Sequence, residues 1–197
     1  ATHYARNAIF SGMMPLEMQK IHPDLWVNEN EEVGKNLNEA KFLKAQLDRN
    51  GINSQFSYSK ITNLKAGREL TQSIKNQKKG DLVVVVYNFV DMISHAKTEM
   101  EIIKELASDN KAFRSLTLSW FKNSPLLEII QQARKLGFNL IVTTDHGTIN
   151  VDQSLKIRGK REINTNLRYK AGQSLSYPPK SVMEVNDPKA LQLPSSH

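Results

Sequence analysis

Two short apolar runs constrain the fold of this chain more than any other feature. Leu82–Tyr87 (LVVVVY) contains five aliphatic residues and a tyrosine, and residues 140–142 (LIV) are followed by two threonines. Uninterrupted aliphatic and β-branched runs are typical of strands buried on both faces, as in parallel sheets covered by helices. We therefore expect an α/β fold with a mainly parallel sheet and helices on both faces.

Helical periodicity and helix-end signals lie between these runs. Ser124 and Pro125 suit the first positions of a helix that Gly137 would end. Helices that alternate with strands are the pattern of right-handed crossovers in a parallel sheet. The other expected elements are helices at residues 5–11, 28–50, 63–77, 97–107 and 112–121, and strands at residues 54–61 and 182–185.

Each apolar run is followed by an aspartate and a histidine. Asp91 and His95 follow the first run, and Asp145 and His146 follow the second. The carboxyl ends of parallel strands collect functional groups at one sheet edge, and a helical spacing of four brings Asp91 and His95 to one side. Carboxylates and imidazoles together bind divalent metals such as zinc. Since the chain has no cysteine, oxygen and nitrogen must supply the ligands, and two such pairs are enough for two metals.

Length and charge narrow the class of protein. The 197 residues are enough for one sizeable domain, and no apolar run approaches the roughly 18 residues of a membrane span. The first residues lack a secretory signal, so we expect a cytoplasmic protein. The net charge of +7 suggests polyanionic partners and is concentrated in residues 156–170. This stretch is either a solvated loop or a wall that attracts phosphate backbones.

Three segments, in this order, resemble the motifs of the alkaline phosphatase superfamily. Residues 2–12 (THYARNAIFSG) resemble its nucleophile helix, residues 91–95 (DMISH) its D-x-x-x-H metal motif, and residues 139–148 (NLIVTTDHGT) its D-H-G motif. The chain most closely resembles the PglZ-type domain, in particular the effector domain of PorX-like response regulators. The segments THYARNAIFSG, INTNLRYK and VVYNFVDMISHAK carry that closer match. The resemblance implies a single alkaline-phosphatase-like domain over residues 1–197.

The resemblance also implies an activity and a set of roles. The expected function is that of a phosphodiesterase or phosphatase with two zinc ions, or Mn²⁺ in their place, acting on nucleotide-type phosphate esters or oligonucleotides. Thr2 would be the nucleophile and form a phosphothreonyl intermediate. Asp91 and His95 would bind one metal, and Thr2, Asp145 and His146 would bind the other.

Further residues stand close to these motifs in the sequence. Arg6 and Asn7 lie one turn beyond Thr2, near enough to contact a phosphate held at the helix N-terminus. Arg168 would clamp the phosphodiester through two hydrogen bonds or brace its own loop. We expect His3 and His22 to be packing or surface residues rather than ligands.

Several alternatives remain open at this stage. The family's first aspartate ligand and last histidine ligand have no counterpart here, so we expect a domain truncated at both ends, without its upstream receiver. Each aspartate also has a purely structural interpretation: Asp145 could belong to a turn at a strand end, and Asp91 could cap the N-terminus of the following helix. The competing functions are a non-catalytic signalling module of a response regulator, with protein partners, and metal-independent nucleic-acid binding through residues 156–170.

Overall fold

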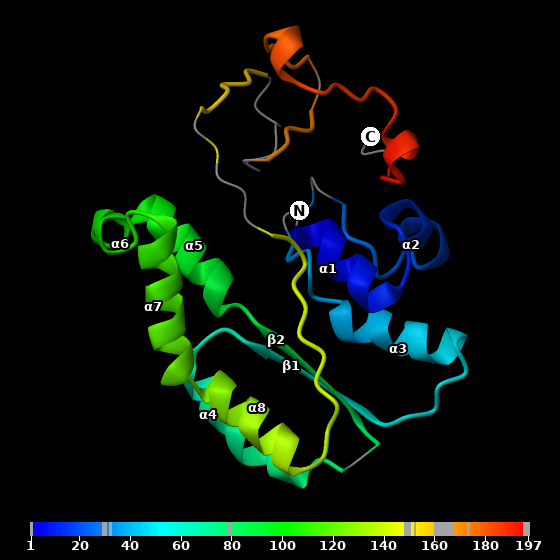
Figure 1. Cartoon of the computed structure of the whole chain (residues 1–197). Coiled ribbons are helices and arrows are strands. Elements are labelled where there is room, and N and C mark those ends of the chain that lie inside the picture. Colours follow the sequence, from blue (N-terminus) through cyan, green and yellow to red (C-terminus); the bar gives the residue numbers. More distant parts are fainter. Residues whose placement is uncertain are drawn as a thin grey trace. The chain divides into compact units, whose positions relative to one another are not determined.

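The computed structural model describes residues 2–28, 31, 33–78, 80–147, 151, 153–159, 168–172 and 174–194. The chain divides into two compact units (Figure 1). Unit 1 comprises Ala1–Asn53 and Thr143–His197, and unit 2 comprises Ser54–Val142. None of the described helices is long and apolar enough to span a bilayer.

A two-stranded parallel sheet forms the centre of unit 2. Strand β1 (Phe56–Ile61) pairs with β2 (Leu82–Tyr87), so the strands expected from both sequence patterns are confirmed. Helix α4 (Leu64–Ser73) and the short 3-10 helix η1 (Ile74–Asn76) connect the strands. A parallel pair requires such a crossover, because the chain must return to the starting edge of the sheet.

Helix α8 (Pro125–Lys135) packs on α4 and completes the small core of unit 2. Gly67 allows this close approach, since an added Cβ would lie 2.7 Å from Tyr87 Oη and 3.1 Å from Pro125 Cβ. The expected helix stop is confirmed at Gly137, which has φ +78°. The core contains buried Ile74, Ile129 and Ala133, with Leu70, Tyr87 and Phe138 packed against them.

Three helices lie between β2 and α8: α5 (Phe89–Glu99), α6 (Glu101–Leu106) and α7 (Asn110–Lys122). The expected bounds of 97–107 are wrong, because the helix begins eight residues earlier and breaks at Met100, whose backbone is extended. Residues 89–96 form an uninterrupted helical segment, as the Asp91–His95 spacing requires.

Unit 1 contains helices α1 (Thr2–Ser11), α2 (Pro15–Ile21) and α3 (Glu39–Arg49). The expected helix at 28–50 is wrong at its described residues 28, 31 and 33–38, because α3 begins only at Glu39. Asparagine has a low helix propensity, and the Asn38 side chain instead donates to Leu25 O at 2.8 Å. The buried apolar residues are Phe10, Met13, Met18, Trp26, Phe42, Leu43 and Leu47.

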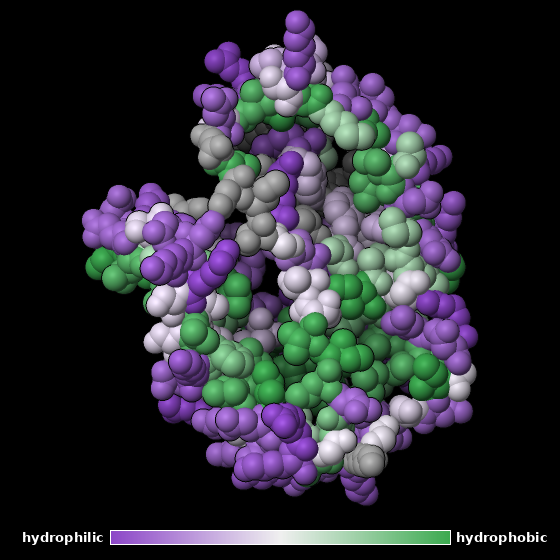
Figure 2. Space-filling view, viewed as in Figure 1, coloured by the Kyte–Doolittle hydropathy of each residue, from purple (hydrophilic) through white to green (hydrophobic). Residues whose placement is uncertain are grey.

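The second apolar run is not a strand. No strand occurs in residues 138–147, and Ile141 and Val142 are 92% and 85% exposed. The strand expected at residues 182–185 is also wrong. Apolar sequence supplies β propensity but not a neighbouring strand to pair with. Hydrophobic residues therefore reach the surface at several places (Figure 2). The described fold is mixed α/β with a two-stranded parallel sheet.

Candidate functional site

Thr2, the first residue of α1, lies beside Asp145 and His146, which follow the exposed apolar run at residues 140–142. The Thr2 Oγ1 atom lies 3.1 Å from His146 Nε2, although 144 residues separate them in the sequence. The same ring nitrogen lies 3.6 Å from Asp145 Oδ2. The structure therefore brings Thr2, Asp145 and His146 together within unit 1, as the resemblance requires, while their chemical roles stay predictions.

Two separations among these atoms are compatible with the ligands of one divalent cation. Zinc bonds of about 2.0–2.2 Å in a tetrahedral arrangement place neighbouring ligand atoms about 3.3 Å apart. The observed separations of 3.1 and 3.6 Å lie on either side of that value. In the described part of the chain, no group donates a hydrogen bond to the buried Asp145 Oδ2. A buried carboxylate oxygen without a donor is costly, and a bound cation would remove that cost.

Arg168 contacts the loop that carries these ligands. Its Nη2 atom donates to Gly147 O at 2.6 Å and lies 3.4 Å from His146 Nδ1. A guanidinium only donates hydrogen bonds, so it holds the Gly147 carbonyl in place. Arg168 therefore braces the loop at Gly147, and a contact with substrate phosphate stays a prediction.

Arg6 and Asn7 are buried and have partners inside unit 1. Two contacts of 2.6 Å join Arg6 to Glu39, one from Nη2 to Oε2 and one from Nε to Oε1. Asn7 Nδ2 donates to Lys35 O at 3.1 Å. A phosphate would have to compete with the Glu39 carboxylate for Arg6. Sequence reasoning missed Glu39, because a glutamate in a first helical turn usually signals only the helix dipole.

The second pair lies in unit 2, on α5. His95 Nε2 is 3.7 Å from Asp91 Oδ2, so the expected one-turn juxtaposition is confirmed. Both side chains are exposed, at 67% for His95 and 47% for Asp91. Across the described ranges, no group of three or more aspartate, glutamate and histidine side chains could hold a metal. A single site that combines both pairs stays a prediction.

Two other histidines serve packing, as expected. The His3 ring is buried and stacks at 4.9 Å on Trp26 and at 4.7 Å on Tyr4. His22 makes an edge contact with Phe42 at 6.2 Å. These rings pack against aromatic neighbours, which agrees with a structural role.

The basic stretch is only partly described. Residues 160–167 lie outside the described residues, as does Thr148 at the end of the D-H-G motif. Arg158 forms an isolated antiparallel bridge with Ser176 through two backbone hydrogen bonds of 3.1 and 2.7 Å. A phosphate-attracting wall therefore stays a prediction.

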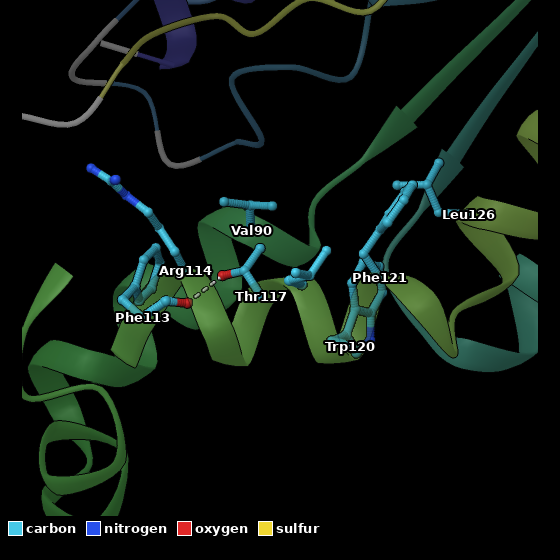
Figure 3. A pocket seen from close by; sticks show the side chains of 8 residues that line it. Val90, Phe113, Arg114, Thr117, Trp120, Phe121 and Leu126 are labelled. Atoms are coloured by element: carbon cyan, nitrogen blue, oxygen red, sulfur yellow. Dashed lines mark hydrogen bonds between the residues drawn. The ribbon is translucent and has the colours of Figure 1, made fainter. Parts of the chain in front are cut away.

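An open hollow of about 330 Å³ lies beside α7 in unit 2 (Figure 3). Val90 on its wall directly precedes Asp91 on α5. The lining residues within the described chain include no carboxylate or imidazole, so the hollow is distinct from the metal ligands. They are Val90, Phe113, Arg114, Thr117, Leu118, Trp120, Phe121 and Leu126.

Comparison with known families agrees with these observations. Residues 1–196 match the family model described as the BREX system PglZ alkaline phosphatase-like domain. A search of curated proteins gives no match. The family description indicates a phosphoesterase-type fold and is consistent with hydrolase activity. Because the match covers nearly the whole sequence, the chain belongs to the PglZ family of alkaline phosphatase-like domains.

Proposed function

We propose that this domain is a metal-dependent phosphoric ester hydrolase with Thr2 as its nucleophile. The observation that carries the proposal is the convergence of Thr2 Oγ1 and Asp145 Oδ2 on His146 Nε2. A hydroxyl, a carboxylate and an imidazole are the groups that such an enzyme needs around the phosphorus atom. Family membership supports the same class of reaction.

The chain's own residues orient the nucleophile. His146 Nδ1 lies 3.3 Å from Gly147 O and 3.4 Å from Arg168 Nη2, and His146 Nε2 lies 3.1 Å from Thr2 Oγ1, so the ring is held between the Gly147 loop and the nucleophile. On attack, the Thr2 hydroxyl releases its proton to water, because a ring nitrogen that holds a cation cannot also accept that proton. In the reaction, the bond from Thr2 Oγ1 to phosphorus forms as the bond to the leaving oxygen breaks. Water then cleaves the phosphothreonine.

The proposed cofactor is zinc, with Mn²⁺ as the alternative. Asp145, His146 and Thr2 would hold one ion and Asp91 and His95 a second, since these oxygen and nitrogen ligands suit either metal. When bound, the cations would neutralise phosphate charge and lower the pKa of the attacking hydroxyl.

The finer assignments follow from charge and resemblance. The net charge of +7 favours polyanionic, nucleotide-type phosphodiesters as substrates. The resemblance to PorX-like proteins supports a role as effector domain of a two-component response regulator in the cytoplasm. A signalling module without catalysis is the second candidate, because each Asp-His pair by itself provides too few ligands for a closed zinc site.

Substitution of the nucleophile separates these two candidates. Thr2→Val keeps the side-chain shape but removes the hydroxyl, and hydrolysis of bis-p-nitrophenyl phosphate and of short oligonucleotides should fall to the rate without enzyme. Thr71→Val is the matched control, because the Thr71 hydroxyl bonds only within α4, to Gly67 O at 3.0 Å. Metal analysis should find about two zinc ions per chain. Full activity of Thr2→Val, or activity that survives chelator, would refute the proposal.

A further inference from the structure

We propose that Glu39 and Arg6 form a buried positioning pair that sets the orientation of Thr2. The inference rests on the proposed function, because it concerns the same nucleophile. Glu39 is 1% exposed and Arg6 is 9% exposed, and their charged groups meet in two contacts of 2.6 Å. Thr2 and Arg6 belong to the same helix, so the pair acts on Thr2 through helix α1.

Helix geometry supplies the connection. Thr2 and Arg6 stand four residues apart on α1, so their side chains lie on neighbouring positions of one helix face. One residue of helix corresponds to a rotation of about 100°. A small rotation of α1 would therefore carry Thr2 Oγ1 away from His146 Nε2, which now lies 3.1 Å from it.

The ion pair gives α1 a direction that apolar contacts cannot give. Apolar burial is non-directional, whereas the hydrogen bond from Arg6 Nη2 to Glu39 Oε2 requires a defined orientation of the two groups. Glu39 is the first residue of α3, so the pair ties the nucleophile helix to a fixed point on its neighbour. Farther along, Arg49 Nη2 of α3 donates to Ser11 O of α1 at 2.8 Å. The two helices are thus joined at both ends of α3, through the middle and the last residue of α1.

Isosteric neutralisation of Glu39 tests the positioning role. We expect Glu39→Gln to lower kcat about a hundredfold with KM within twofold, because misplacement of a reacting group by about 1 Å has that effect. If Arg6 instead bound the substrate phosphate, its substitution would raise KM. The matched control is Asp48→Asn, which removes an exposed ion pair with Lys44 on the same helix and should change neither constant.

A double variant separates positioning from folding. In Arg6→Met with Glu39→Leu, an apolar pair of similar volume replaces the buried charges, and such replacements preserve folding. We expect this variant to melt at or near the wild-type temperature and still show the loss of kcat. Wild-type kcat in the double variant would overturn the inference.

A spectroscopic measurement gives an answer independent of turnover. The ¹⁵N chemical shift of His146 Nε2 reports its contact with the Thr2 hydroxyl, and we expect Glu39→Gln to move it toward the value in Thr2→Val. An unchanged shift in Glu39→Gln would contradict the positioning role. Full activity of Thr2→Val would instead refute the nucleophile assignment, so the two failures are distinguishable.

Discussion

The buried Arg6–Glu39 pair leads to a quantitative prediction about the stability of unit 1. Glu39→Leu would leave the Arg6 guanidinium without its carboxylate, in a site where only 11% of the arginine side chain reaches solvent. Removing one partner of a buried pair costs about 3–5 kcal/mol, whereas an exposed pair contributes at most about 1 kcal/mol. Because Arg6 retains slight exposure, we expect a loss near the lower end, about 3 kcal/mol.

The double variant provides the internal comparison. Arg6→Met with Glu39→Leu should lie within about 1 kcal/mol of the wild type, because no charge is left buried. Its loss should be much smaller than the sum of the two single losses, and the difference measures the coupling energy. Asp48→Asn on the surface of α3 should change the free energy of unfolding by less than about 0.5 kcal/mol.

Tryptophan fluorescence during urea unfolding is a suitable assay. The chain has two tryptophans, Trp26 in unit 1 and Trp120 in unit 2, so a Trp120→Phe background makes the signal specific for unit 1. Trp26 is buried and stacks on His3, which makes its emission sensitive to unfolding. A loss of less than 1 kcal/mol for Glu39→Leu would refute the reasoning, because the pair would then behave as an exposed one.

Three further predictions concern other parts of the chain. Gly67→Ala should destabilise unit 2 by about 1–2 kcal/mol, because overpacking against Tyr87 and Pro125 outweighs the gain in helix propensity. Denaturant unfolding followed by Trp120 fluorescence measures this change in the free energy of unfolding. A more stable variant would contradict the close approach of the helices at Gly67. Burial raises the pKa of the Tyr87 phenol, so the folded state holds this proton more tightly than the unfolded state. The contribution of Tyr87 to the free energy of unfolding is therefore fully present below about pH 10 and decreases as the pH rises above that value. Tyr87→Phe should reduce the dependence of this free energy on pH in unfolding curves between pH 9 and 11. Arg168→Gln should lower kcat with little change in KM if the guanidinium only holds Gly147 O, whereas a rise in KM in steady-state assays would indicate contact with substrate.

Local patterns predicted part of the fold correctly. The run at Leu82–Tyr87 forms β2, and the signals at Ser124, Pro125 and Gly137 bound α8 as expected. Ser124 nevertheless makes no side-chain cap, since its hydroxyl donates to Phe121 O at 2.9 Å. The strand expected before Asp145 was wrong, because a strand exists only with a partner that the local sequence does not specify.

In the candidate site, too, some contacts were predictable from local sequence and others were not. The four-residue spacing of Asp91 and His95 was sufficient to predict their juxtaposition, since helical neighbours follow from local geometry. The approach of Thr2 to His146 had no local signal and was expected only from the resemblance. The partner of Arg6 was not predicted at all.

Near neighbours in the chain thus account for most of the helices, the extended backbone of Leu82–Tyr87 and the types of chemical group available to the site. Packing between distant segments accounts for the placement of Thr2 beside His146, the burial of Arg6 against Glu39 and the exposure of Ile141. The physical reason is that backbone propensity acts over a few residues, whereas burial and charge pairing depend on which segments meet after folding.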